Sequence, residues 1–71
     1  MINPKDVNVG DAIRVINYQK SEKIELVHTV LRKRVESGGV TLWFHGSGGW
    51  FYDFEGYATG SALIEQIMEI L

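Results

Sequence analysis

Residues 40–57 read VTLWFHGSGGWFYDFEGY and hold seven of the eight aromatic residues of this chain. The segment divides into two runs that contain aromatic residues, VTLWF and WFYDFEGY, separated by the glycine-rich stretch HGSGG. Aromatic side chains bury about 150–250 Å² each and dominate the energetics of cores and interfaces. In a chain of 71 residues without cysteine, this segment must therefore build the core, a binding surface or both.

Length and charge limit the classes of protein to consider. Seventy-one residues predict one domain, residues 1–71, and the net charge of −2 argues against a general nucleic-acid binder. The first 35 residues carry seven basic and four acidic side chains, and the remainder carries five acidic and no basic ones. We expect the two halves to complement each other within the fold. Without a membrane-length apolar segment or a leader-like N-terminus, we expect a cytoplasmic protein with no membrane partner.

Most of the chain has the pattern of an antiparallel sheet. Residues 1–10 are expected to form an N-terminal arm, because Pro4 disfavours helix before it and Gly10 favours a turn. Strands are predicted over residues 11–18, 24–36, 40–45 and 50–55, within a sheet spanning 11–57. The apolar residues of 24–36 also fit a helical period. Strand is preferred there because Val and Thr dominate and a Gly-Gly turn follows.

The first strand is preceded by the pattern V-x-x-G-D-x-I-x-V, carried by Val7, Gly10, Asp11, Ile13 and Val15. This opening resembles that of small SH3-like barrels, in which a Gly-Asp turn leads into the first strand. The resemblance covers nine residues and implies a barrel fold. Such barrels serve as protein-binding, RNA-binding and enzyme-accessory modules, so the resemblance implies no single activity.

The C-terminal residues predict a helix over 61–71. Ser61 is a suitable N-cap, Glu65 lies near the positive end, and the apolar side is unusually wide. We expect this helix to pack on the sheet or to join two copies of the chain in a homo-oligomer. The predicted fold is therefore mainly β (α+β): a small antiparallel meander or SH3-like barrel of about four strands, with one C-terminal helix.

The glycine-rich turns fix which side chains share a face. A two-residue turn at Gly38 and Gly39 makes three cross-strand pairs: Val35 with Leu42, Arg34 with Trp43, and Arg32 with His45. A two-residue loop at 47–48 would place Asp53 on the apolar face, so a three-residue loop over 46–48 is preferred. That loop pairs Phe44 with Trp50, Leu42 with Tyr52, and Val40 with Phe54.

This register gives the sheet two different faces. The core face comprises Leu31, Val35, Val40, Leu42, Phe44, Trp50, Tyr52 and Phe54. The opposite face mixes aromatic rings with charged groups, a composition typical of interaction hot spots, and is the candidate binding surface. It comprises Arg32, Arg34, Trp43, His45, Phe51, Asp53 and Glu55. The competing interpretation is that the C-terminal helix covers this face and makes it core.

Catalysis and metal binding have little support in the sequence. There is no cysteine, and turn chemistry explains the serines, so we expect no enzyme activity. His28, His45 and Asp53 have no metal-ligand spacing, and we expect neither a metal site nor a cofactor. The run HGSGGW lacks the Lys-Ser/Thr ending of a phosphate loop and precedes a strand.

The sequence favours a non-enzymatic accessory or regulatory module that binds another protein, such as a bacteriophage or mobile-element inhibitor of a host protein. Trp43 and Phe51 would anchor the contact, and Arg32 and Arg34 would supply hydrogen bonds. The acidic residues Asp53 and Glu55 would select against wrong partners. One alternative is single-stranded nucleic acid bound through the same arginines and rings. A second alternative is a nucleotide-like ligand in an aromatic pocket.

Overall fold

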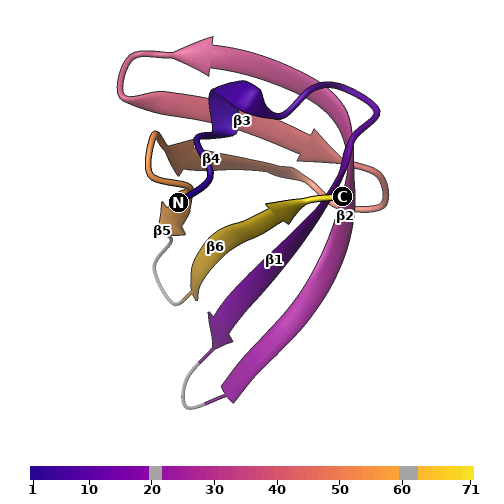
Figure 1. Ribbon diagram of the computed structural model, residues 1–71, viewed down its shortest axis with the longest axis vertical. Helices are drawn as coiled ribbons and strands as arrows, with labels where there is room; N and C mark the ends of the chain where they lie inside the picture. The colour runs from indigo at the N-terminus through magenta and orange to yellow at the C-terminus, as the bar shows by residue number, and fades with distance from the viewer. Residues whose placement is uncertain (20–21, 60–62) are drawn as a thin grey trace.

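A computed structural model describes residues 1–19, 22–59 and 63–71 of the chain. They form a short 3₁₀ helix, η1 (Pro4–Asp6), and six strands in one antiparallel sheet of order β4-β3-β2-β1-β6-β5 (Figure 1). The strands are β1 (Ala12–Gln19), β2 (Glu22–Glu36), β3 (Gly39–Phe44), β4 (Gly49–Asp53), β5 (Tyr57–Thr59) and β6 (Leu63–Ile70). The prediction of a mainly β, antiparallel fold is confirmed. No helix in these ranges is long and apolar enough to span a bilayer.

The long strand β2 joins the two halves of the sheet. Its residues 22–29 pair with β1, and its residues 30–36 pair with β3 on the opposite edge. The register with β3 shifts between Val30 and Arg32, which leaves Leu31 as a bulge. Bulges bend a strand and increase its twist, and Figure 1 shows β2 as a long curved ribbon. Strands β1 to β4 therefore form a meander that curls around the core.

The barrel form of the prediction is not found. Strands β4 and β5 are the two edges of the sheet, and no ladder joins them within the described ranges. The sheet is therefore open. It also has two more strands than expected, because β5 and β6 return to the far side of β1.

The prediction of a C-terminal helix is wrong. Residues 63–70 form β6, which pairs with β1 on one edge and with β5 on the other; residues 61 and 62 lie outside the described ranges. The register with β1 shifts at Met68, so Ile67 and Ile70 both pack toward the core. A bulged strand thereby places residues three apart on one face, which imitates a helical period. The structure therefore gives no support to a homo-oligomer joined through a C-terminal helix.

The core lies on the concave face and draws on most of the chain. Val7, from the arm after η1, is fully buried there, whereas Val9 is exposed. The buried hydrophobic residues are Val7, Ile13, Val15, Val30, Val40, Leu42, Phe44, Tyr52, Ala58 and Ile67. The arm is also held by Lys33, whose ammonium donates a 2.7 Å hydrogen bond to the carbonyl of Lys5.

Five of the eight predicted core residues lie on the concave face. Val40, Leu42, Phe44 and Tyr52 are buried, and Trp50 is partly buried against them. The prediction is wrong for three others, which are 39–52% exposed: Leu31, Val35 and Phe54. Leu31 is the bulged residue, Val35 lies near the end of β2, and Phe54 belongs to the turn after β4.

Both hairpin registers differ from the predicted ones by two residues. The first turn is Ser37-Gly38, so Val35 pairs with Val40. In the second hairpin, Val40 pairs with Tyr52 instead of Phe54. Because side chains alternate with a period of two, an error of two leaves the residues that pair between 32–36, 39–43 and 49–53 with their predicted alternation, whereas the bulge at Leu31 turns Val30 into the core. For this reason Trp43 and Phe51 still share one face of the sheet, and Leu42 and Tyr52 share the other.

Gly39 provides the first stability test. A Cβ on Gly39 would overlap the carbonyl oxygen of Tyr52, whereas nothing lies within 4 Å of a Cβ on Gly48. We expect Gly39→Ala to lower the free energy of unfolding by about 1–3 kcal/mol, as overpacking does. Gly48→Ala, the matched control, should change it by less than about 1 kcal/mol. Urea denaturation of both variants measures the difference, and equal effects would contradict this packing.

Candidate functional site

The convex face of β2, β3 and β4 carries two aromatic side chains, Trp43 and Phe51, and two arginines lie over the Trp43 ring. Trp43 on β3 lies directly opposite Arg32 on β2, and Phe51 on β4 lies opposite Thr41 on β3. The guanidinium carbons of Arg32 and Arg34 lie 4.6 and 5.5 Å from the centre of the Trp43 ring. Such cation–π contacts contribute about 0.5–1 kcal/mol each at exposed sites. We call Arg32, Arg34, Trp43 and Phe51 the aromatic face.

Two glycines let these rings lie flat on the sheet. A Cβ on Gly49, the direct partner of Trp43, would come within 2.6 Å of the indole nitrogen. A Cβ on Gly39 would come within 2.7 Å of Cζ of Phe51. Each ring therefore covers the backbone of a neighbouring strand. Phe51 remains 46% exposed, so the aromatic face is open to a partner.

The two arginines of this face differ in their partners. Arg34 donates a 3.1 Å hydrogen bond to Glu36, whose other carboxylate oxygen accepts one from the hydroxyl of Thr41. Arg32 contacts Trp43 but forms no salt bridge with any carboxylate in the described ranges. Its guanidinium is held in place by the ring while its donors stay available.

The hydrogen bonds formed by the remaining predicted site residues shape a strand end and a turn, not the aromatic face. His45 follows the end of β3, and its backbone N–H donates to the carbonyl of Thr29. The Asp53 carboxylate accepts the backbone N–H groups of Glu55 and Tyr57, at 2.9 and 3.1 Å, and so shapes the turn into β5. Glu55 lies exposed within that turn. The expected helix over the aromatic face is absent, because residues 63–70 form β6.

A second cluster, on the concave face, was missed by the sequence analysis. The carboxylate of Glu65 on β6 is 1% exposed and accepts two hydrogen bonds, from the Tyr52 hydroxyl at 2.6 Å and the Asn17 amide at 3.1 Å. Nε2 of His28 lies 3.4 Å from the same carboxylate, an ion-pair distance without hydrogen-bond geometry. We call Asn17, His28, Tyr52 and Glu65 the Glu65 cluster.

Four strands meet in the Glu65 cluster, one residue from each. Asn17 and Glu65 are direct cross-strand partners on β1 and β6, and the His28 ring stacks on Phe44 with centroids 4.3 Å apart. A buried carboxylate is costly unless donors surround it, so each partner offsets part of that cost. Oδ1 of Asn17 has no hydrogen-bond partner in the described structure. In the sequence, Asn17, His28 and Glu65 stand out only as polar residues that adjoin apolar ones.

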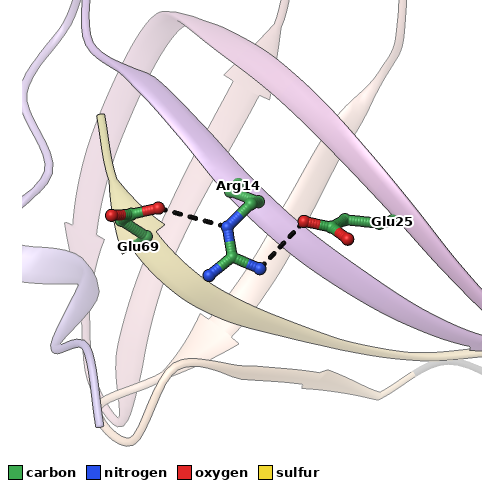
Figure 2. A network of polar contacts seen from close by, with 3 residues as sticks. All are labelled: Arg14, Glu25 and Glu69. Atoms are coloured by element: carbon green, nitrogen blue, oxygen red, sulfur yellow. Dashed lines mark hydrogen bonds and ion pairs between the residues drawn. The ribbon is translucent and has the colours of Figure 1, made fainter.

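The convex face of β1 carries an ion-pair network across three strands (Figure 2). The Arg14 guanidinium donates to Glu69 on β6 at 3.2 Å and to Glu25 on β2 at 2.9 Å. These hydrogen bonds, first to Glu69 and then to Glu25, raise the pKa of Arg14. The Arg14–Glu69 contact joins the basic and acidic halves of the sequence. Both carboxylates are more than half exposed, so each pair contributes little stability.

The two sites offer different chemistry. The described residues contain no group of His, Asp or Glu arranged to hold a metal ion. The Glu65 cluster is enclosed in the core, whereas the aromatic face lies on the convex side of the sheet and exposes Phe51 to solvent. No family model, curated protein or solved structure matches this chain, so its function is inferred from its own surfaces.

Tyr52 makes the Glu65 cluster sensitive to alkaline pH. Burial, helped by the hydrogen bond to Glu65, raises the pKa of Tyr52 above its usual value of 10.0. As the pH rises past 10, the unfolded chain releases this proton before the folded chain does. The folded state then holds more protons, so the free energy of unfolding falls by up to about 1.4 kcal/mol per pH unit.

The variant Tyr52→Phe lacks this proton. We expect it to lose about 1–3 kcal/mol at neutral pH, because the buried carboxylate loses a donor. Above pH 10 its stability should decline less steeply than that of the wild type. Urea denaturation at several pH values between 8 and 11 measures both slopes. Parallel curves would show that the Tyr52 hydroxyl is not held as described.

Proposed function

We propose that this protein is a non-enzymatic accessory or regulatory module that binds another protein through its aromatic face. The observation that carries this proposal is the position of Trp43, held beneath two guanidinium groups beside the exposed ring of Phe51. Trp and Arg are the residues most enriched in binding hot spots. A bacteriophage or mobile-element inhibitor of a host protein is one form that such a module takes.

The aromatic face is prepared for binding before any partner arrives. Trp43 is confined between Arg32 above and the backbone of Gly49 below, so its ring has little freedom left to lose. Immobilising a free side chain on binding costs about 0.5–1.5 kcal/mol, and this cost is already met in the folded chain. A rigid aromatic surface on the convex side of the sheet fits the surface of a protein better than an enclosed small ligand.

The charges around the face indicate what the partner presents. Arg34 is neutralised by Glu36, whereas Arg32 keeps donors available above the Trp43 ring. A guanidinium with free donors favours bidentate bonding to a carboxylate. The expected partner surface therefore carries an apolar side chain for Phe51 and an acidic side chain for Arg32.

Single-stranded nucleic acid is the second candidate, because cations and exposed rings also serve as stacking platforms for bases. The cation–π geometry of Arg32 and the exposure of Phe51 favour it. Glu36 weakens it by occupying Arg34, and so does the net charge of −2. A nucleotide-like ligand fits this surface less well, since Trp43 and Phe51 lie on the convex face of the sheet instead of lining a concave site.

Phe51 is the side chain with which to test protein binding, because it is 46% exposed and lies outside the buried core. We expect Phe51→Ala and Arg32→Ala each to weaken partner binding about 30-fold or more, as hot-spot truncations do. Val27→Ala is the matched control: an apolar side chain that is 60% exposed, on the part of β2 outside the aromatic face. All three variants should unfold at urea concentrations near that of the wild type.

The measurement is quantitative affinity capture from native lysate with the wild type and the three variants. The captured protein's affinity is then determined by calorimetry with purified components. A protein retained by wild type and Val27→Ala, but lost by Phe51→Ala and Arg32→Ala, supports the proposal. Equal retention by all four chains would place binding elsewhere and overturn it.

Tryptophan fluorescence separates the nucleic-acid candidate. If the partner is a protein, titration with mixed-sequence single-stranded DNA in low salt should leave the emission of Trp43 and Trp50 unchanged. A quench that disappears as salt rises, and that Phe51→Ala removes, would transfer the function to nucleic acid.

A further inference from the structure

The first half of β2 has an open edge. Residues 22–29 pair with β1 on one side, but β3 pairs only with residues 30–36. Among the described residues, no strand therefore borders 22–28 on the other side. Figure 1 shows this part of β2 at the bottom of the view, away from β3 and β4. The open edge is separate from the aromatic face.

The backbone groups at this edge follow from the register. The N–H of Val30 donates to Asp11 beside β1, whereas the carbonyl of Thr29 accepts from His45 on the opposite side. Hydrogen-bonding directions alternate along a strand. The N–H and C=O groups of Lys23, Glu25 and Val27 therefore point outward from the open edge, and those of the even residues point to β1.

The edge lacks several of the features by which proteins block strand addition. Residues 22–28 contain no proline, and their pairing with β1 shows no bulge. Two apolar side chains on the concave face lie beside it, Ile24 at 36% and Leu26 at 38% exposed. Both would lose contact with water if another strand were added.

We propose that a second copy of this chain adds to the open edge, strand β2 against strand β2, antiparallel about a two-fold axis at Ile24. In this register Lys23 of each copy lies opposite Glu25 of the other. Opposite charges therefore meet twice across the symmetric interface. Ile24 lies against Ile24 of the second copy, and one sheet runs through both molecules.

The charges favour this register over the two registers whose two-fold axis lies one or two residues further along β2. A two-fold axis at Glu25 would place two carboxylates directly opposite each other, which is destabilising. An axis at Leu26 would place Lys23 opposite a threonine and form no charge pair. The overlap at Ile24 is short, so the association is expected to depend on concentration and to weaken with salt. It leaves the aromatic face of each copy uncovered.

A charge exchange tests the interface. Lys23→Glu and Glu25→Lys should each lower the dimerisation constant about tenfold, because like charges then face each other twice. An equimolar mixture of the two variants should associate again, since each supplies the charge that the other needs. Sedimentation velocity in low salt over a range of concentrations measures this. A wild type that stays monomeric at millimolar concentration, or a mixture no better than its components, would overturn the proposal.

Cysteine cross-linking tests the register directly, because the chain has no cysteine of its own. A non-hydrogen-bonded antiparallel pair has a Cα separation of about 4.5 Å, within disulfide range. Ile24→Cys should therefore form a covalent dimer under mild oxidation. Leu26→Cys, similarly exposed on the same face, should not, because its two copies are separated by roughly 13 Å along the strands. Preferential cross-linking of Leu26→Cys would contradict the register.

Discussion

The backbone of β2 is the constraint on which the rest of the structure depends. Its two halves bond to different strands on opposite edges, and the bulge at Leu31 marks the change from β1 to β3. This division curls the sheet around its core. It also exposes the aromatic face on one half of β2 and leaves an open edge on the other half. Backbone hydrogen bonding therefore accounts for the position of both surfaces.

The Glu65 cluster adds specificity to this apolar core. Its carboxylate receives donors from β4 and β1 and lies beside His28 on β2, so four strands must be aligned before it is satisfied. Replacing such a cluster by apolar residues is often neutral or stabilising, which makes stability a poor explanation for it. We infer that it fixes the pairing of β6 with β1, since a slip of one residue would turn the carboxylate out to solvent.

The aromatic face and the open edge meet different physical requirements. The face offers rigid rings and one guanidinium with free donors, which suits a chemically specific partner. The edge offers unpaired backbone groups and a self-complementary pair of charges, which suits a copy of itself. Because the aromatic face uses only the second half of β2, with β3 and β4, and the open edge lies on the first half, a paired molecule would present two aromatic faces and would bind a repeated partner with higher avidity.

The sequence by itself determined which side chains of the two hairpins share a face. The alternation between its two glycine-rich turns places Trp43 and Phe51 on one face and Leu42 and Tyr52 on the other. This holds even though both predicted registers differ from the observed ones by two residues. Tertiary structure decided the rest. Residues 63–70 have an apolar spacing that suits a helix or a bulged strand. Pairing with β1, which the sequence does not show, selects the strand. Asn17 and Glu65 are 48 positions apart, so no local pattern could bring them together. Turns and alternation act between near neighbours, whereas ladders and buried charges depend on residues that the chain brings together only when it folds.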